Sequence, residues 1–444
     1  MPILPSRPSP SPAVLVRTTK PATIHDLPGE IFKYIIRLLR GDDCSLKACC
    51  LTSHSWLVPT QGTLHEDVHI NCSNRNCVYP VRYSSPEIAQ YVHSLTVLEL
   101  PPPIRYSPEE ETHDTHVLVW DILPRFTQLR RLTIHSMEWF CTQERRDILS
   151  TTFSRVSSFR LCDIKFKHVY DFLFFMSAFP NISSLHLDGV SWPYPLHSLT
   201  LLRDYPRQQL DALSAQTLRT LSFGCRYGDF PTHVVEDIVQ HWLCLSPHPA
   251  LCVKWQARTC VDSLPYLLRA LGPSISSLDI GIIKGKPMLC IPDSGIQHCT
   301  ELRSLVLRGS CAPVSDESFP IGGRTYSDGT YSWLPLLLSD VHSCKISRVG
   351  FACALRDSSD IRRFSGILDV IDECLSRPTF RQLTEVSFSV DGLVATAGRP
   401  SKRAAWLFEE TQAQLVDMIW DNVPQMAGRN ILHMHNGWEH YQLW

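Results

Sequence analysis

Residues 156–161 read VSSFRL, and residues 182–187 read ISSLHL. The two hexapeptides begin 26 residues apart and share one pattern, in which apolar residues stand at the first, fourth and sixth places. The last two of these alternate with a polar residue, as the side chains of a short β-strand with one buried face do. The pattern therefore predicts a strand in each copy.

The same pattern returns along most of the chain. Nine copies fit it: Val92/Leu95/Val97, Leu129/Leu132/Ile134, Val156/Phe159/Leu161, Ile182/Leu185/Leu187, Leu218/Leu221/Phe223, Ile275/Leu278/Ile280, Leu302/Leu305/Leu307, Ile346/Val349/Phe351 and Leu383/Val386/Phe388. A weaker copy fits at Ala250/Val253/Trp255, and we expect a further strand at 430–434. Spacings of 26 and 27 residues occur between copies, together with longer ones up to 44. Each unit is too small to bury its apolar face alone, so repeated units are expected to stack into a solenoid.

Helix-like stretches separate many of the predicted strands, at 168–179, 233–245, 263–271, 361–375 and 406–420. A strand followed by a crossover helix and another strand is typical of a parallel sheet. The fold class is therefore predicted to be α/β. An ordinary α/β domain with a parallel sheet is the alternative to a solenoid.

The copies resemble leucine-rich repeats of degenerate sequence. The asparagine that follows the strand in that family is absent, and Leu161-x-x-Ile164 and Leu187-x-x-Val190 keep only an apolar residue at its place. The resemblance implies an irregular horseshoe-shaped α/β solenoid over residues 71–444, with a parallel sheet on its inner side.

Ahead of the repeats, residues 27–70 carry three helix signals. Pro28 and Glu30 favour a helix start. Apolar residues then recur at helical spacing, which predicts one apolar face made by Ile31, Tyr34, Ile35, Leu38 and Leu39. A second helix begins after Gly41, where Asp42 or Asp43 can cap it.

The third helix is predicted to begin near Ser53 and to be broken by Pro59. A module of this size buries little core on its own. We therefore expect its apolar surface to dock onto a partner, the alternative being a three-helix subdomain folded onto the rest of the chain. Residues 1–22, rich in proline and serine, are predicted to form a disordered tail.

Residues 23–70 resemble the F-box family, and especially F-box proteins of mushroom-type fungi. The likeness is carried by Leu27, Pro28, Glu30 and Ile31, then Leu46 and Cys49, then Trp56, within a stretch of the form Leu-Lys-Ala-Cys-x-Leu-x-Ser-x-x-Trp-Leu-x-Pro. His54 departs from the arginine usual there, and Cys50 and Thr52 stand where apolar residues are commoner.

The resemblance implies that these helices bind the adaptor subunit of an SCF-type cullin–RING ubiquitin ligase. It also implies that the remainder of the chain selects a protein substrate. The residues expected to form or support the adaptor-binding surface are Leu27, Pro28, Ile31, Ile35, Leu38, Leu46, Cys49 and Trp56.

The substrate-binding surface is expected on the strands, where side chains alternate with the buried ones. This face combines charged and small polar residues, and it offers no aromatic cluster as a centre of binding. The residues chosen as candidate substrate contacts are Arg131, His135, Arg160, His186, Asp188 and Arg308.

Composition narrows the classes of function. The 444 residues are 44% hydrophobic and carry a formal net charge of −2, which gives no electrostatic footprint for nucleic acid or a membrane surface. The 17 cysteines show no disulfide-type spacing, and the N-terminus lacks a secretory apolar segment. We therefore expect reduced thiols and a cytoplasmic or nuclear location.

No catalytic motif, cofactor motif or standard metal pattern is recognised. The one tight cluster of potential metal ligands, His65, His69, Cys72 and Cys77, has spacings that match no zinc site. The sequence thus predicts a non-catalytic substrate receptor without a cofactor. The alternative is a non-catalytic leucine-rich-repeat scaffold that acts outside a ubiquitin ligase.

Overall fold

The structure is a computed structural model that describes residues 28–71, 83, 85–98, 123–139, 149–193, 213, 215–224, 231–246, 248–256, 263–282, 294–310, 319–321, 324–326, 333–354, 358–390 and 416–435. The chain divides into two compact units, Met1–Glu66 and Asp67–Trp444. Leu27 and the tail at residues 1–22 lie outside the described residues.

The second unit is built on a twelve-stranded sheet whose described strands are all parallel and follow one another in chain order. The strands are β1 (Asp67–Asn71), β2 (Ser94–Leu98), β3 (Arg131–Trp139), β4 (Ser158–Phe166), β5 (Ser184–Asp188), β6 (Thr220–Gly224), β7 (Leu251–Gln256), β8 (Ile275–Ile282), β9 (Ser304–Ser310), β12 (Arg348–Ala354), β13 (Glu385–Val390) and β14 (Leu432–His435). Each strand thus lies beside the strand that precedes it in the chain, as the successive units of a repeat protein do.

The predicted strands are confirmed. Every copy of the pattern, including the weaker one and the strand expected at 430–434, falls on a strand of the sheet. Its middle apolar residue takes one register position, so that Leu132, Phe159 and Leu185 lie side by side. These three side chains are at most 2% exposed, because the alternation places them on the buried face.

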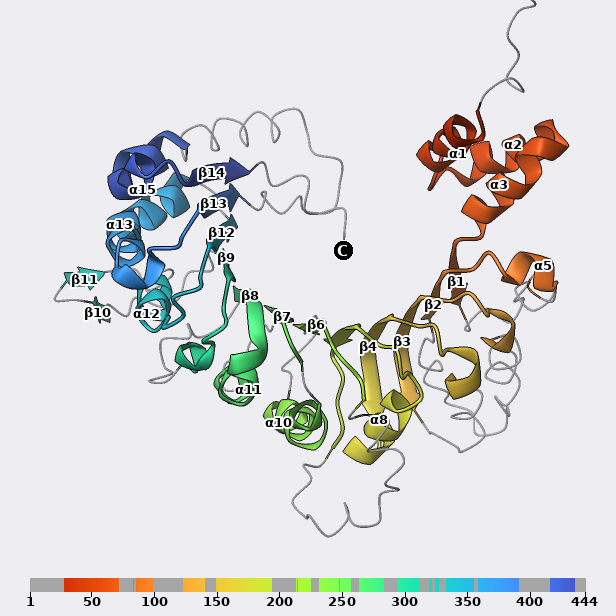
Figure 1. Cartoon of the computed structure of the whole chain (residues 1–444), viewed down its shortest axis with the longest axis horizontal. Coiled ribbons are helices and arrows are strands. Elements are labelled where there is room, and N and C mark those ends of the chain that lie inside the picture. The colour runs from red at the N-terminus through yellow and green to blue at the C-terminus, as the bar shows by residue number, and fades with distance from the viewer. Residues whose placement is uncertain are drawn as a thin grey trace, which may run out of the picture. The chain divides into compact units, whose positions relative to one another are not determined.

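Helices cover one face of this sheet and lie along the outside of its curve (Figure 1). They are α5 (Pro86–Ala89), α8 (Val169–Met176), α10 (Thr232–His241), α11 (Ser263–Leu271), α12 (Trp333–Ser339), α13 (Ser358–Leu375), a helix at 416–422 and α15 (Pro424–Gly428), with short 3-10 turns at 123–125, 243–245, 272–274, 296–298 and 378–380. We call the opposite face, formed by the side chains that alternate with the buried ones, the strand face. Between β9 and α12, β10 (Phe319–Ile321) and β11 (Arg324–Tyr326) pair as an antiparallel hairpin.

The core lies between the sheet and the helices and is filled by large aromatic side chains. The ring of Phe159 on β4 stacks on that of Phe179, with centroids 4.7 Å apart. The indole of Trp192 donates a buried 2.9 Å hydrogen bond to a carboxylate oxygen of Asp237 on α10. This bond ties the segment after β5 to the helix that follows β6 in the chain.

Backbone pairing replaces the asparagine that these repeats lack. Ile164 and Val190, which stand at its place, are buried in the core instead. The amide of Phe166 donates to the carbonyl of Ser191, and the amide of Ser191 donates to the carbonyl of Ile164, at 2.9 and 3.0 Å. The polar backbone of this turn is thus satisfied by the neighbouring repeat rather than by a side chain.

The first unit holds three helices, α1 (Gly29–Leu38), α2 (Asp43–Thr52) and α3 (His54–Leu64). Asp42 caps α2 as predicted, because its carboxylate accepts the amide of Ser45 at 3.0 Å. The prediction that Pro59 breaks the third helix is wrong, since α3 continues through it. A proline removes only one N–H of the helix, and Trp56 before it and Leu64 after it pack into the same core.

Candidate functional site

The three N-terminal helices enclose a small core. Ile36, Leu46 and Trp56 form its centre, and the partly buried Phe32, Leu39, Cys49 and Leu64 pack against it. The rings of Phe32 and Trp56 meet edge to face with centroids 4.7 Å apart. Two residues expected at the adaptor-binding surface, Leu46 and Trp56, therefore support the module from inside.

Several large apolar side chains of these helices are exposed to solvent. Among the described residues eight large apolar side chains are exposed, and five of them lie in α1, α2 and α3: Ile31 (48%), Tyr34 (62%), Leu38 (67%), Leu51 (88%) and Val58 (53%). We call these five the exposed apolar patch. Such a concentration in the smaller unit is typical of an interaction site.

The two faces of α1 differ from the prediction. The sequence grouped Ile31, Tyr34, Ile35, Leu38 and Leu39 into one face, but the core takes Phe32, Ile36 and Leu39. Helical spacing is satisfied by either set, so periodicity alone could not assign the inward face.

The remaining predicted adaptor contacts divide by exposure. Pro28, Ile31 and Leu38 are exposed, whereas Ile35 and Cys49 are half-buried. Tyr34, Leu51 and Val58, the other exposed apolar side chains of this module, were not among the predicted contacts. The sequence could have indicated Tyr34, because it belongs to the apolar residues that recur at helical spacing in α1. For Leu51 and Val58 the only indication was that the residue type is apolar.

The six predicted substrate contacts all lie on strands, at strand-face positions of the register. Four of them come together on adjacent strands: His135 on β3, Arg160 on β4, and His186 and Asp188 on β5. Arg131 stands at the start of β3, and Arg308 lies apart on β9. The prediction thus contains one cluster and two separate positions.

Most charges of this cluster and its surroundings are paired between strands of the sheet. Arg160 lies 3.7 Å from the carboxylate of Asp188, and Arg131 lies 3.4 Å from that of Asp67. Arg308 makes a two-pronged contact with Asp279 on β8, at 2.7 and 3.0 Å. The strand face is therefore polar and internally balanced at these positions, and it suits hydrogen bonding more than attraction of a strongly charged ligand.

Buried ionisable groups lie on the helical side of the sheet and are poorly suited to chemistry. Burial raises the pKa of the Cys299 thiol to about 12, which keeps it protonated and unreactive at neutral pH. Burial also lowers the pKa of His241, against the opposing effect of Asp237. The pKa of His248 is likewise lowered by burial.

Within the described ranges, no group of three or more His, Cys, Asp or Glu side chains is placed to hold a metal ion. Of the cluster considered in the sequence, His65 is buried and His69 is exposed on β1, while Cys72 and Cys77 lie outside the described residues. The helices that the structure describes include none that is both long and apolar enough to cross a membrane.

Neither a scan against models of known protein families nor a search of curated proteins finds a match to this chain.

Proposed function

We propose that this chain is a substrate-recognition subunit of an SCF-type cullin–RING ubiquitin ligase. In this proposal α1, α2 and α3 act as an F-box that docks the adaptor, and the repeats bind the protein to be ubiquitinated. The observation that carries it is the exposed apolar patch on a three-helix module whose sequence resembles the F-box.

Burial of this patch would supply a driving force for docking. A fully buried Leu, Ile or Val side chain gains roughly 1.5–3 kcal/mol relative to exposure in water. Leu38 and Leu51 are 67% and 88% exposed, so much of that gain is still to be made. The small core of Ile36, Leu46 and Trp56 leaves the module with little stability of its own, and a partner would add to it.

The second unit supports the other half of the proposal. A parallel sheet whose strands follow chain order, with helices on one face, is the arrangement that the leucine-rich-repeat resemblance implies. It leaves a broad polar strand face for a protein target. The paired charges on that face would confer selectivity through hydrogen-bond geometry.

Co-expression with an SCF adaptor subunit tests the proposal. We expect the wild-type chain to co-purify with the adaptor and the double variant Leu38→Asp/Leu51→Asp to lose it. Both side chains are exposed, so the variant should keep its fold, which circular dichroism can check. Lys33→Asp is the matched control, an exposed residue of α1 outside the patch.

The alternative function, a leucine-rich-repeat scaffold outside a ubiquitin ligase, predicts a different result. A folded wild-type chain that fails to bind any adaptor would favour it. Adaptor binding without a ubiquitinated client when the proteasome is blocked would favour it as well.

A further inference from the structure

One residue position recurs just before the strands of the second unit. Its carbonyl accepts backbone amides from the next repeat: that of Arg130 accepts the amides of Ser157 and Ser158, and that of Arg303 accepts those of Ser347 and Arg348. We call the residues at this register position the turn row, which consists of His93, Arg130, Ser157, Ser183, Arg219, Leu251, Ser276, Arg303, Ser347 and Thr384. Two members differ in their bonding: the Leu251 carbonyl accepts the hydroxyl of Ser276, and Thr384 donates its amide to the carbonyl of Ser347.

Three arginines stand in this row at equal intervals. Arg130 precedes β3, Arg219 precedes β6 and Arg303 precedes β9, so consecutive arginines are three strands apart. With about 4.8 Å between neighbouring strands, the interval is about 14 Å. An extended peptide rises about 3.4 Å per residue, so four of its residues span the same distance.

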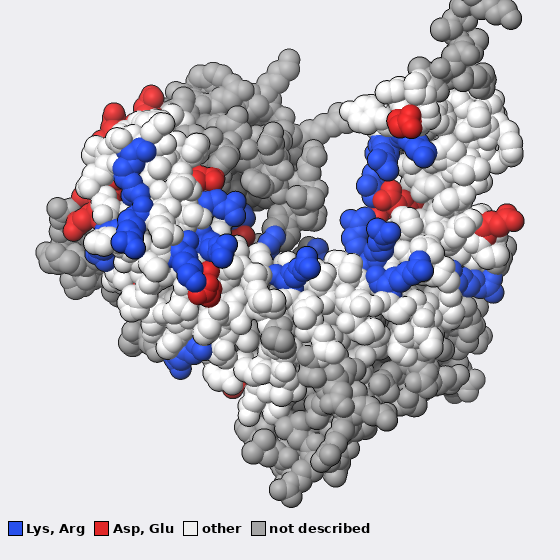
Figure 2. All heavy atoms as spheres, in the orientation of Figure 1, with Lys and Arg blue, Asp and Glu red and all other residues white. Residues whose placement is uncertain are grey.

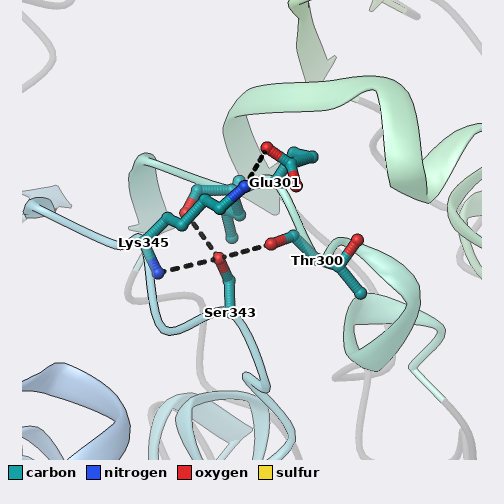
Figure 3. Close-up of polar contacts among 5 residues, drawn as sticks. Thr300, Glu301, Ser343 and Lys345 are labelled. Carbon is teal, nitrogen blue, oxygen red and sulfur yellow. Dashed lines mark hydrogen bonds and ion pairs between the residues drawn. The ribbon is translucent and has the colours of Figure 1, made fainter.

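All three arginine side chains are exposed. None of them makes an ion pair or side-chain hydrogen bond with another described residue. Other cations near the strand starts are already engaged. Arg155 donates to the amide oxygen of Gln128 at 2.6 Å, and Lys345 pairs with Glu301 beside the Ser343 hydroxyl (Figure 3).

Several hydroxyl groups between the arginines are also occupied. The hydroxyls of Ser183, Ser276 and Ser347 donate to the carbonyls of Ser157, Leu251 and Arg303, at 3.1, 3.4 and 3.2 Å. Their protons are therefore unavailable to a partner. The arginines remain as the strong donors of the row.

Basic residues also outnumber acidic ones at the strand starts. The turn row and the first residues of the strands of the twelve-stranded sheet together hold five arginines, against Asp67 and Glu385. Figure 2 shows Lys and Arg side chains at several places over the second unit, with Asp and Glu side chains beside some of them. Many of the acidic residues lie instead on the helices, including Asp171 on α8, Glu236 and Asp237 on α10, and Asp369 and Glu373 on α13. The strand starts are thus locally basic in a chain whose net charge is only −2.

We propose that Arg130, Arg219 and Arg303 bind an extended acidic segment of a partner protein, with carboxylates at every fourth residue. Charge complementarity selects the acidic partner, and the 14 Å interval selects the spacing. The proposal rests on the proposed function in one respect, namely that the acidic segment belongs to the protein target. A single-stranded nucleic acid fits less well, because it requires exposed aromatic rings for base stacking. The aromatic residues of β4, β6 and β12 are buried in the core; they are Phe159, Phe166, Phe223 and Phe351.

Fluorescence anisotropy with labelled peptides tests the proposal on the full chain. The probe is a 12-residue peptide with Glu at positions 1, 5 and 9 and Ser elsewhere, and the comparison peptide has Glu at positions 1, 2 and 3. We expect tighter binding of the spaced peptide, at low salt. Each of Arg130→Gln, Arg219→Gln and Arg303→Gln should weaken it about two- to fivefold, as exposed charge pairs do, and the triple variant at least about tenfold.

Arg269→Gln on the exposed side of α11 is the control and should leave peptide affinity unchanged. Equal affinity for the two peptides, or a triple variant that binds as the wild type does, would overturn the proposal. Tighter binding of a uridine 12-mer than of the spaced peptide would also overturn it.

Adaptor co-purification of the triple variant separates this proposal from the proposed function. If the triple variant loses peptide binding but still binds the adaptor, the result supports the role of the three arginines independently of the proposed F-box. If the wild-type chain binds the adaptor but does not bind the spaced peptide, only the proposal for Arg130, Arg219 and Arg303 is overturned.

Discussion

The guanidinium of Arg308 on β9 donates two hydrogen bonds to the carboxylate of Asp279 on β8, at 2.7 and 3.0 Å. The Asp279 side chain is only 9% exposed, whereas in the comparable pair of Arg131 and Asp67 the carboxylate is 37% exposed. Both pairs join strands of the sheet, but they do so in different degrees of contact with water. The cost of breaking them should differ accordingly.

Replacing Asp279 by Asn should therefore lower the free energy of unfolding by about 2 kcal/mol, because it leaves the arginine without its charged partner. Asp67→Asn should cost less than about 0.5 kcal/mol, since an exposed pair contributes little. Urea unfolding followed by tryptophan fluorescence measures both. Equal losses in the two variants would contradict this ranking.

Trp56→Ala should destabilise the N-terminal helices by about 3 kcal/mol, because it removes the largest side chain of a very small core. Leu51→Ala should change stability by less than about 0.5 kcal/mol, since that side chain is 88% exposed. Hydrogen exchange of residues 29–64 distinguishes the two variants. Protection that survives Trp56→Ala would show that the helices do not depend on this core.

Gly189 should resist substitution by alanine. Its φ is +70°, and a Cβ there would lie 2.5 Å from a carboxylate oxygen of Asp163. Gly189→Ala should therefore cost about 1–3 kcal/mol. Gly366 on α13 is the control, because a Cβ there meets nothing within 4 Å and alanine favours a helix. A neutral Gly189→Ala, measured by thermal unfolding, would argue against this turn.

Acidification should weaken the second unit. Burial holds the pKa of His241 and of His248 below the ordinary value of 6.5, so both side chains are neutral in the folded protein near pH 7. The unfolded chain binds protons at these positions first as the pH falls below 6.5. The free energy of unfolding should therefore decrease from pH 7 downward until the folded-state pKa values are passed.

Replacement of both histidines by Asn removes these groups from the titration. The slope of unfolding free energy against pH between 7 and 5.5 should be smaller in His241→Asn/His248→Asn than in the wild type. An unchanged slope would assign the acid sensitivity to other groups.

The sequence was most informative for the sheet. The strand pattern depends on residues such as Phe159 and Leu185, whose burial is decided by the alternation itself. One strand, β1, was missed although Val68 and Ile70 fit the pattern and align with Leu95 and Val97. The first place of that copy holds His65, which is buried where the other copies carry an apolar residue.

The strand β1 also shifts the division between the units. The division between the two units falls after Glu66, whereas the sequence analysis extended the helical module to residue 70.

The candidate sites were less predictable. Two apolar sets on α1 have helical spacing, and only the positions of α2 and α3 select Phe32, Ile36 and Leu39 for the core. The turn row depends on backbone hydrogen bonds between repeats that are 26 to 44 residues apart, so its three arginines had no local signal. Long-range geometry of this kind cannot be read from residue spacing when insertions interrupt the period.

Adaptor binding by the purified chain tests the central claim most directly. Titration calorimetry with an SCF adaptor subunit should give saturable one-to-one binding for the wild type and for Lys33→Asp. The folded Leu38→Asp/Leu51→Asp variant should give none. A folded wild-type chain that shows no binding, or a double variant that binds as tightly as the wild type, would contradict the account.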